Sequence, residues 1–379
     1  MKKLRVHILR GKNKVGENLI EITDGDKKLL LEYGTPLMPT KEAIAIEGKV
    51  LDTFYDAIII THCHADHCGL LRVGTKTNVV CMGAATYKIL SYCNGLHQET
   101  ENKLRFLRNE ESFWIGKIKI TPYLCDHSAY DSYMILIEKE EERILYTGDF
   151  RGNGRKNFPA FLKRLPNKVD LLITEGTNLT ENKNCCTEKE LEEQAFEMFS
   201  SKGKIFVLQS TLNIDRTVTF YRASKRTRRR FIQTLSSADI CCALKNIPNP
   251  LEYNDCYTYL NRGVGNERYE QVRNRYRKKL LSKNQIAKMD DFIMQVSGNF
   301  LSYFNELSKL CDLSGSIFVY SLWEGYKRDM QNTLEKIEKM GIEIINLHTS
   351  GHADVHTLKA LQERVNPQET VFVHRESMG

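Results

Sequence analysis

The chain has 379 residues, of which 41% are hydrophobic, 27% are charged and only 8 are proline. This balance excludes the disordered, collagen-like and disulfide-rich classes, and the length indicates roughly two or three domains. No apolar run approaches the roughly 20 residues of a membrane span. The N-terminal segment carries charges where a signal peptide needs a continuous apolar stretch. We therefore expect a cytoplasmic protein with no membrane partner.

The net charge of +7 arises from one internal segment. Residues 201–340 contain 24 Lys and Arg against 14 Asp and Glu, a balance of +10, and the remainder of the chain has a balance of −3. A clustered excess of one sign is typical of proteins with an acidic partner such as nucleic acid. The 11 cysteines include no CxxC pair, so we expect free thiols in a reducing compartment.

Several short apolar segments run directly into loops that carry polar or histidine side chains. Their β-branched composition predicts buried strands at 57–60, 143–147, 169–174, 342–347 and 370–373. In α/β proteins, polar groups at the carboxyl ends of buried strands usually build the site. Because these segments span the whole chain, its first and last parts must share one body, and the middle is predicted to be an insertion.

The predicted insertion alternates between helices and strands. The pattern predicts, in order, a Glu-rich helix at 187–201 that begins at Thr187, a strand at 204–208, a helix from 214 that runs into 222–230, a charged helix at 267–289, a strand at 316–320 and a helix at 327–340. This order predicts an α/β fold. We expect a body formed by residues 1–194 and 336–379, with a smaller basic α/β domain inserted at 195–335.

Three histidines and an aspartate follow the first predicted strand, in the segment His62-Cys63-His64-Ala65-Asp66-His67. Imidazoles pack poorly in a core unless each ring nitrogen has a partner, whereas neutral imidazole and carboxylate are good ligands for divalent metals. In an extended loop His62 and His64 point the same way, while Asp66 and His67 come from the next bend. The segment can therefore serve two adjacent metal ions.

Two ions need more ligands than this segment supplies. His127, Asp149 and a late histidine are the candidates, because each follows a predicted strand or lies in a loop with a polar partner. Taken alone, Asp149 after a glycine would be an ordinary turn residue and His127 would carry little weight. They are candidates for metal ligands only because they could lie beside the His62–His67 segment in the folded protein.

These motifs resemble those of a known group of proteins. The segment His62–His67 resembles the signature of the metallo-β-lactamase fold superfamily, and Asp126-His127-Ser128 and Thr147-Gly148-Asp149-Phe150-Arg151 resemble its next two ligand motifs in order. Thr349-Ser350-Gly351-His352-Ala353 and Val371-Phe372-Val373-His374-Arg375-Glu376 are similar to the last two motifs of the β-CASP nucleases, and ribonuclease J-like proteins are the nearest group. The resemblance implies an αββα sandwich with an inserted β-CASP-like domain.

The resemblance also implies roles for individual residues. One metal would be held by His62, His64 and His127, and a second by Asp66, His67 and His374, with Asp149 bridging them. His352 would contact the scissile phosphate or donate a proton, and Glu175 would orient a ligand or a histidine. Together, Asp66, Asp149, Glu175 and His352 are the expected catalytic residues. The expected ions are zinc, with manganese or iron as alternatives.

The chain departs from the family pattern at two places. Glu32 stands where the family usually has an aspartate in a strand-end Asp-x-Gly, so we expect a longer side chain to take a supporting role beside the metal ligands. Arg375 follows His374 where ribonuclease J-like proteins tend to have a small residue, which adds a cation that could assist or obstruct phosphate binding.

Six cations lie close together in the predicted insertion, namely Arg222, Lys225, Arg226, Arg228, Arg229 and Arg230. Cations of this kind neutralise backbone phosphates without reading base identity. The alternative is a solvated helix face, which explains most single charge runs. We expect this basic run to bind nucleic acid, together with Ser350 in the Gly-containing loop before His352. RNA is favoured over DNA by the resemblance alone.

The sequence thus predicts a two-metal phosphodiesterase that hydrolyses nucleic acid, in particular single-stranded RNA, with a metal-bridging water as nucleophile. Three alternatives stay open: a hydrolase of a small ester, thioester or lactone on the same metal core, a DNA-directed β-CASP nuclease, and a nucleic-acid-binding protein that has lost catalysis. The resemblance also allows a homo-oligomer.

Overall fold

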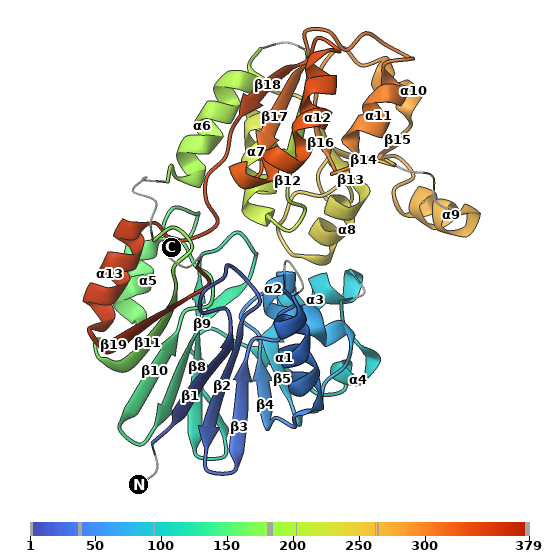
Figure 1. Cartoon of the computed structure of the whole chain (residues 1–379). Helices are drawn as coiled ribbons and strands as arrows, with labels where there is room; N and C mark the ends of the chain where they lie inside the picture. The colour runs from blue at the N-terminus through green and yellow to red at the C-terminus, as the bar shows by residue number, and fades with distance from the viewer. Residues whose placement is uncertain are drawn as a thin grey trace. The chain divides into compact units, whose positions relative to one another are not determined.

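The computed structural model describes residues 3–36, 40–93, 95–179, 185–201, 203–261, 263 and 265–375. The chain divides into two compact units (Figure 1). The first consists of Met1–Cys185 together with Gly351–Gly379, and the second is Cys186–Ser350.

The first unit contains two packed β-sheets. One has the strand order β1 (Arg5–Arg10), β2 (Leu19–Asp24), β3 (Lys27–Leu31), β4 (Ala57–Ile59), β5 (Val80–Gly83) and β6 (Leu104–Leu107). The other has the order β19 (Pro367–Val373), β11 (Val169–Glu175), β10 (Glu142–Tyr146), β9 (Ser132–Lys139), β8 (Ile118–Cys125) and β7 (Phe113–Ile115). Ile22 and Ile59 of the first sheet share one buried apolar cluster with Ile135 and Ile173 of the second. The two inner faces therefore form the core of this unit.

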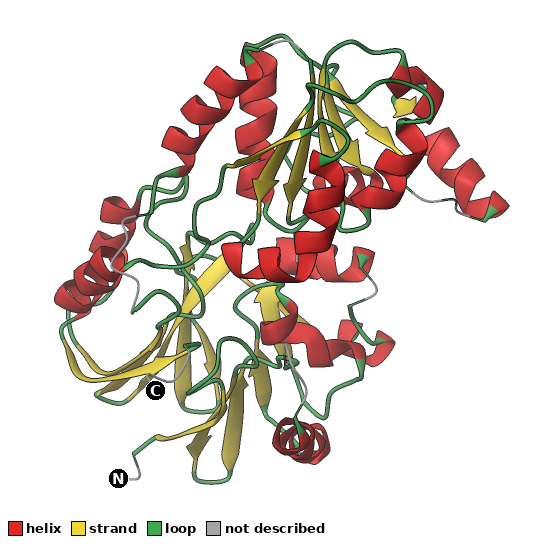
Figure 2. Cartoon of the chain, turned by 45° about the horizontal axis from the view of Figure 1, so that its top comes forward, coloured by secondary structure: helices red, strands yellow, loops and turns green. Residues whose placement is uncertain are grey.

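Helices pack on the outer sides of both sheets (Figure 2). Those that follow strands of the first sheet are α1 (Lys41–Asp52), α2 (Ala65–Cys68), the 3₁₀ turn η1 (Gly69–Arg72), α3 (Ala84–Tyr92) and α4 (Gln98–Glu101). On the second sheet, Leu145 and Leu172 pack with Phe161 of α5 (Phe158–Arg164) and Leu361 of α13 (Val355–Val365). This arrangement is the αββα sandwich that the resemblance implies, and it confirms the predicted fold class.

The strand directions in the second sheet bring several loops to one edge. Strand β9 is antiparallel to both β8 and β10, while β10, β11 and β19 are mutually parallel. The carboxyl ends of β8, β10, β11 and β19 therefore lie at the same edge of the sheet. The segments that carry His127, Asp149 and His374 leave this sheet at the ends of β8, β10 and β19.

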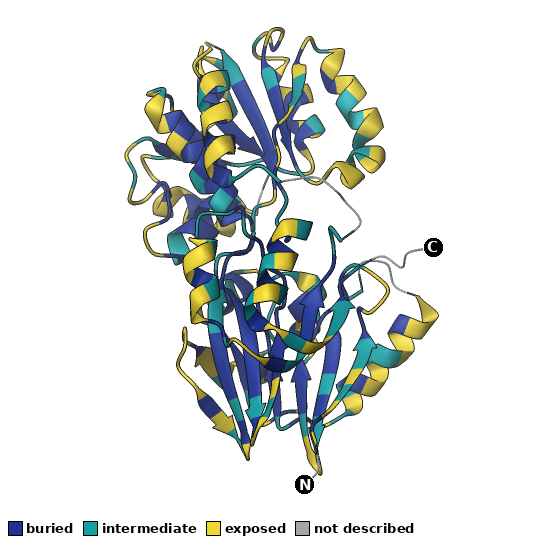
Figure 3. Ribbon diagram, turned by 90° about the vertical axis from the view of Figure 1, so that its left-hand side faces the viewer, coloured by how far each residue is buried: buried dark blue, intermediate teal, exposed yellow. Residues whose placement is uncertain are grey.

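The second unit is built on a seven-stranded sheet whose paired strands are all parallel. Its order is β15 (Leu280–Leu281), β14 (Cys256–Tyr259), β13 (Phe231–Thr234), β16 (Phe292–Val296), β12 (Lys204–Gln209), β17 (Ile317–Ser321) and β18 (Glu343–Asn346). Its helices are α6 (Glu188–Phe199), α7 (Ile214–Arg226), α8 (Leu235–Ala243), α9 (Asn266–Arg275), α10 (Lys283–Ala287), α11 (Phe300–Leu307), η2 (Glu324–Tyr326) and α12 (Lys327–Glu338). Apolar clusters on both faces bury the strands, and Figure 3 shows this burial in dark blue. The strands of such a sheet have near-continuous apolar sequences, because both faces of the sheet are covered.

The bounds of the second unit differ from the expected 195–335. At its beginning, Leu191 and Phe199 of α6 pack with Phe220 of α7, so this helix belongs to the second unit. At its end, β18 was expected in the body, but Ile344 and Ile345 pair with β17 in the second sheet. A short apolar run before a histidine-bearing loop does not reveal which of two sheets it will join.

Two predicted helices are shorter than expected. The segment 267–289 contains α9, then the short strand β15, then α10, because Leu280 and Leu281 pair with β14 and Ser282 caps a new helix. Helix α7 ends at Arg226, and Arg228 adopts a left-handed backbone conformation with φ of 58°. The last arginines of the basic run therefore lie beyond the helix.

Two predicted helix starts are confirmed. Thr187 caps α6 in a capping box with Glu190, and Asp354 caps α13. Within the described ranges, no helix is both long enough and apolar enough to cross a membrane.

Candidate metal centre

The predicted metal ligands of the first unit lie together. His62, His64, His127 and Asp149 form one group of ligand atoms that are all within 4.8 Å of one another. A second group of the same compactness consists of Asp66, His67 and His374. His62 and His67 are fully buried, and the other members are buried or half-buried. Helix α2 supplies Asp66 and His67, and the loops after β4, β8, β10 and β19 supply the other side chains.

Asp149 faces both groups. Its Oδ2 atom lies 3.2 Å from His67 Nε2 and 3.5 Å from His374 Nε2 in one group. The same atom lies 3.9 Å from His62 Nε2 and 3.9 Å from His127 Nε2 in the other. Burial alone would raise the pKa of Asp149, but the surrounding histidines, His374 first, hold it well below its usual value. One carboxylate oxygen is thus shared by two sets of ligands.

The first group has the protonation state that a metal requires. Burial lowers the pKa of His62 and His127 well below 6.5 and that of His64 to about 4, with nearby histidines adding to the effect. His62 Nε2 and Asp149 Oδ1 are buried and have no hydrogen-bond partner among the described residues. An orphaned buried polar atom costs roughly 1–3 kcal/mol, and a cation would relieve this cost. The residues therefore fit a divalent metal, as neutral imidazole and carboxylate are suitable ligands.

The second group differs in protonation. Burial lowers the pKa of His67, but the carboxylates of Asp149, Asp66 and Glu32 outweigh burial and raise this pKa well above 6.5. Without a metal, His67 therefore holds a proton that an incoming cation must displace.

Glu32 supports ligands of both groups. Its Oε1 lies 3.1 Å from His67 Nδ1, which leaves Nε2 of that ring directed toward Asp149. Its carboxylate also accepts hydrogen bonds from the backbone N–H and the hydroxyl of Thr61, and the Thr61 hydroxyl lies 3.0 Å from His62 Nδ1. The Tyr146 hydroxyl donates to Glu32 over 3.2 Å. A hydrogen bond to the ring nitrogen that does not bind the metal fixes the tautomer and the orientation of a ligating imidazole.

Glu175 and His352 form a pair at the edge of the centre. Glu175 Oε2 lies 3.0 Å from His352 Nδ1, and Glu175 Oε1 accepts a hydrogen bond from the Phe150 N–H. Burial opposes protonation of His352, yet Glu175 and Asp149 together raise its pKa to about 9. Its Nδ1 also lies 3.6 Å from Asp149 Oδ2, so His352 adjoins the same carboxylate as the ligands do.

Sequence reasoning missed several supporting side chains. Arg151 is fully buried and forms an ion pair with Asp126 over 2.8 Å, which joins the loop of Asp149 to the loop of His127. His127 Nδ1 lies 2.6 Å from the Gly351 carbonyl, and the Thr177 hydroxyl lies 2.8 Å from His374 Nδ1. Asp126 and Arg151 did stand inside the quoted motifs, but nothing in their spacing showed that they pair.

The structure divides the predicted basic run into two kinds of residue. Arg229 is only 6% exposed, and its guanidinium donates to the carbonyls of Phe199, Ser201, Gly203 and Phe292. Its predicted contact with nucleic acid is therefore wrong, because this cation joins backbone segments inside the second unit.

The other members of the run reach the surface. Arg222 and Arg226 are engaged by Glu192 and Glu193 of α6 over 3.2 and 2.8 Å. Lys225, Arg228 and Arg230 are exposed. Arg230 directly precedes β13, so these three exposed cations lie near the amino edge of the parallel sheet, which is the edge where its strands begin. Ser350 is half-buried in the loop between Thr349 and Gly351.

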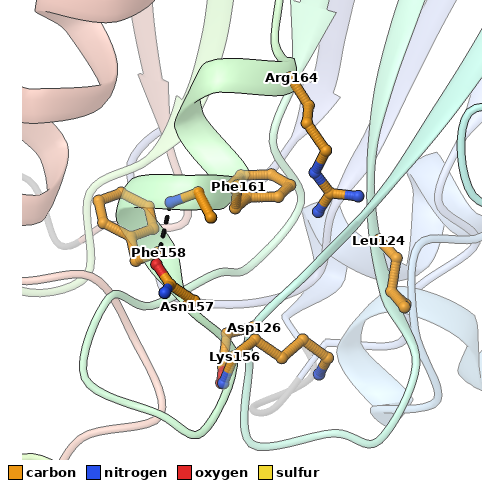
Figure 4. A pocket seen from close by; sticks show the side chains of 8 residues that line it. Leu124, Asp126, Lys156, Asn157, Phe158, Phe161 and Arg164 are labelled. Carbon is orange, nitrogen blue, oxygen red and sulfur yellow. Dashed lines mark hydrogen bonds between the residues drawn. The ribbon is translucent and has the colours of Figure 1, made fainter.

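A shallow pocket of about 300 Å³ opens beside the loop of His127. Figure 4 shows Phe158 and Phe161 of α5 together with Arg164, Lys156 and Leu124 around it. Asn157 caps α5 at its rim by accepting from the Ala160 N–H over 3.0 Å. None of the predicted ligands lines this pocket.

Comparison with known proteins agrees with the geometry. A family model described as a beta-lactamase superfamily domain matches residues 45–226. Ribonuclease J of Corynebacterium glutamicum is 24% identical over 195 residues, covering 47% of this chain and 27% of that protein. An RNase J-like protein of Methanocaldococcus jannaschii is 25% identical over 214 residues, covering 52% of this chain and 49% of that protein. The chain thus matches between about a quarter and a half of the length of these relatives.

A solved structure shares the fold of the whole chain. A protein of unknown function from Enterococcus faecalis V583 superposes with a TM-score of 0.79 at 17% identity, covering 99% of this chain and 94% of that one. At this identity the likeness concerns the fold alone.

Proposed function

We propose that this chain is a two-metal phosphodiesterase that hydrolyses single-stranded RNA, because residues 45–226 match a beta-lactamase superfamily model and the chain is similar to ribonuclease J proteins. The observation that carries this proposal is the position of Asp149, whose Oδ2 faces two compact groups of ligand atoms at once. A bridging carboxylate is the arrangement expected for a pair of neighbouring divalent ions.

We assign the ligands by group. His62, His64 and His127 would hold one ion and Asp66, His67 and His374 the other, with Asp149 placed to serve both. Zinc is the expected metal because the sets are rich in imidazole, with manganese and iron as the alternatives. Such a pair would supply an activated water and would neutralise charge on the phosphate.

The remaining residues act on the substrate or position the residues that do. His352 carries a proton at neutral pH when metal is absent, and Glu175 fixes its ring through Nδ1. Nε2 is then the atom that can contact a phosphate oxygen or protonate the leaving group. Lys225, Arg228 and Arg230 supply cations for the RNA backbone. We also propose a cytoplasmic location, in keeping with the reducing compartment expected for cysteines without framework spacing.

The test is hydrolysis of end-labelled single-stranded RNA and DNA by the metal-loaded protein. We expect metal-dependent cleavage of RNA that is lost in His64→Ala, in Asp149→Ala and in His352→Ala. The matched control is His356→Ala, which removes an exposed histidine of α13 four residues after His352 and is expected to retain activity. Preferred cleavage of DNA would indicate a DNA-directed enzyme, and turnover of small esters without cleavage of either polymer would refute the nuclease proposal.

A further inference from the structure

We propose that Trp323 and Tyr326 form a stacking platform for unpaired bases of the substrate strand, an inference that rests on the proposed action on single-stranded nucleic acid. Both residues follow β17, in the turn that contains η2. Trp323 is 57% exposed and Tyr326 is 49% exposed, so both rings are open to solvent although they are large and apolar. Successive bases of single strands stack on aromatic side chains of this kind.

The turn holds the indole in a defined place. The rings of Trp323 and Tyr326 meet edge to face, with centroids 5.4 Å apart and an angle of 89°. A Cβ atom at Gly325 would collide with the six-membered ring of Trp323, so the indole lies directly against the backbone of the turn. The Trp323 carbonyl accepts hydrogen bonds from the Tyr320 hydroxyl and the Tyr326 N–H, each over 3.1 Å. A rigid aromatic side chain loses little entropy when it binds.

The platform lies at a different edge of the sheet from the basic run. All paired strands of the second sheet are parallel, and Trp323 follows the carboxyl end of β17. The neighbouring strand β18 ends at the same edge, and from there the chain continues through Thr349 to His352. Arg228 and Arg230 instead lie at the amino edge, where β13 begins. The aromatic pair is therefore at the edge from which the chain leads to the proposed catalytic histidine.

The charges around the platform favour bases over phosphates as its ligands. Glu324 and Asp329 balance Lys327 and Arg328 in sequence, and Lys327 Nζ lies 3.4 Å from Glu324 and above the ring of Tyr320. Because these four charges cancel, we expect the platform to contribute through stacking. Binding to it should depend weakly on salt, unlike phosphate contacts, each of which releases counterions.

Fluorescence gives a direct test, because the chain has 2 tryptophans. The other is Trp114 in the first unit, which is 62% exposed. Trp114→Phe leaves Trp323 as the only indole, and we expect single-stranded RNA, added in EDTA to prevent cleavage, to quench its emission. The matched control, Trp323→Phe, leaves only Trp114, which RNA should not quench. Quenching of Trp114 alone, or of neither indole, would overturn the proposal.

Binding and kinetics test the contribution to affinity. We expect Trp323→Ala to weaken binding of single-stranded RNA and raise its KM by roughly 5- to 100-fold, by a similar factor at low and high salt. Trp323→Phe should restore most of the affinity, whereas Gly325→Ala, which displaces the indole without removing it, should resemble Trp323→Ala. Circular dichroism melts must match the unmodified protein for these comparisons, and Tyr326→Ala serves as a second variant if Trp323→Ala unfolds.

Two further outcomes separate the possible failures. If the unmodified protein hydrolyses neither RNA nor the small diester bis-p-nitrophenyl phosphate, the proposed function fails and the KM comparison cannot support the platform. If it cleaves RNA but Trp323→Ala changes only the sedimentation coefficient, the aromatic pair is a contact between copies of the chain and the platform is refuted.

Discussion

At the scale of single residues, the side chain that departs from the resembled motifs, Glu32, contacts both groups of predicted ligands or their partners. Glu32 has a left-handed backbone conformation with φ of 66°, which is unusual for a residue with a side chain. From this position its carboxylate reaches His67 directly and His62 through Thr61. One side chain thus supports a ligand in each group.

We predict that Glu32→Asp separates the two metal sites. The shorter carboxylate cannot keep both the Thr61 contacts and the His67 contact, so His67 loses the partner that fixes its tautomer. The affinity for the second ion should fall roughly 10- to 100-fold, while the first ion is retained. Metal analysis after dialysis measures this, with Glu42→Asp on the exposed start of α1 as control. Equal loss of both ions would contradict the assignment.

The opposite pKa shifts predict stepwise release of metal on acidification. Protons compete for a ligand only below its pKa, and burial holds the pKa of His64 at about 4, while the pKa of His67 is raised well above 6.5. The group with His64 should therefore retain its ion at about pH 5.5, whereas the group with His67 should lose its ion as the pH falls from neutrality. Metal content per chain across this range gives the result, and simultaneous release would contradict it.

At the scale of elements, the end of α7 shows how a basic run combines structural and surface roles. The chain turns at Arg228, and the next residue directs its side chain inward, where Arg229 donates to four backbone carbonyls of the second unit. Those carbonyls belong to the end of α6, the following loop and β16. Arg229 therefore holds three segments together.

We predict that Arg229→Ala lowers the free energy of unfolding by about 2–4 kcal/mol, because several buried acceptors lose their donor. Urea denaturation followed by circular dichroism measures the change. Arg228→Ala, one residue earlier and exposed, should stay within about 0.5 kcal/mol of the unmodified protein. Equal effects of the two substitutions would show that Arg229 has no special structural role.

The sequence predicted those elements and residues whose signals are local. The histidine motif after β4 places several candidate ligands within six consecutive residues, so it is visible without any tertiary contact. Thr187 and Asp354 are side chains that commonly cap helices, so they indicated where two helices begin. Features that depend on tertiary pairing were missed. Leu280 and Leu281 form a strand only because β14 lies beside them, and β18 joins the second sheet only because β17 is its neighbour. The Asp126–Arg151 pair and the burial of Arg229 likewise depend on segments distant in sequence.

At the scale of the whole molecule, the charge is unevenly divided. The net +7 comes from the excess in residues 201–340, and within it the exposed cations Lys225, Arg228 and Arg230 gather near the amino edge of the second sheet. Charges of this kind attract a polyanion without distinguishing its sequence.

Log affinity for single-stranded RNA falls with log salt, and we predict that replacing Lys225, Arg228 and Arg230 together by glutamine makes this slope less negative by about 2, since each phosphate contact contributes roughly −0.7. Titrations at several salt concentrations measure the slope. Glutamine replacement of Lys12, Lys14 and Lys49, which belong to the first unit, is the control and should leave it unchanged. An unchanged slope in the first variant would remove the basic run from RNA binding.

The two ends of the second unit are joined by a hydrogen bond from the Thr349 hydroxyl to the Cys186 carbonyl. The inserted segment therefore leaves and rejoins the rest of the chain at neighbouring points, a geometry that makes domain insertion tolerable. In evolutionary terms, an inserted domain with neighbouring ends can be exchanged for another domain of the same kind without displacing the segments of the first unit that precede and follow it.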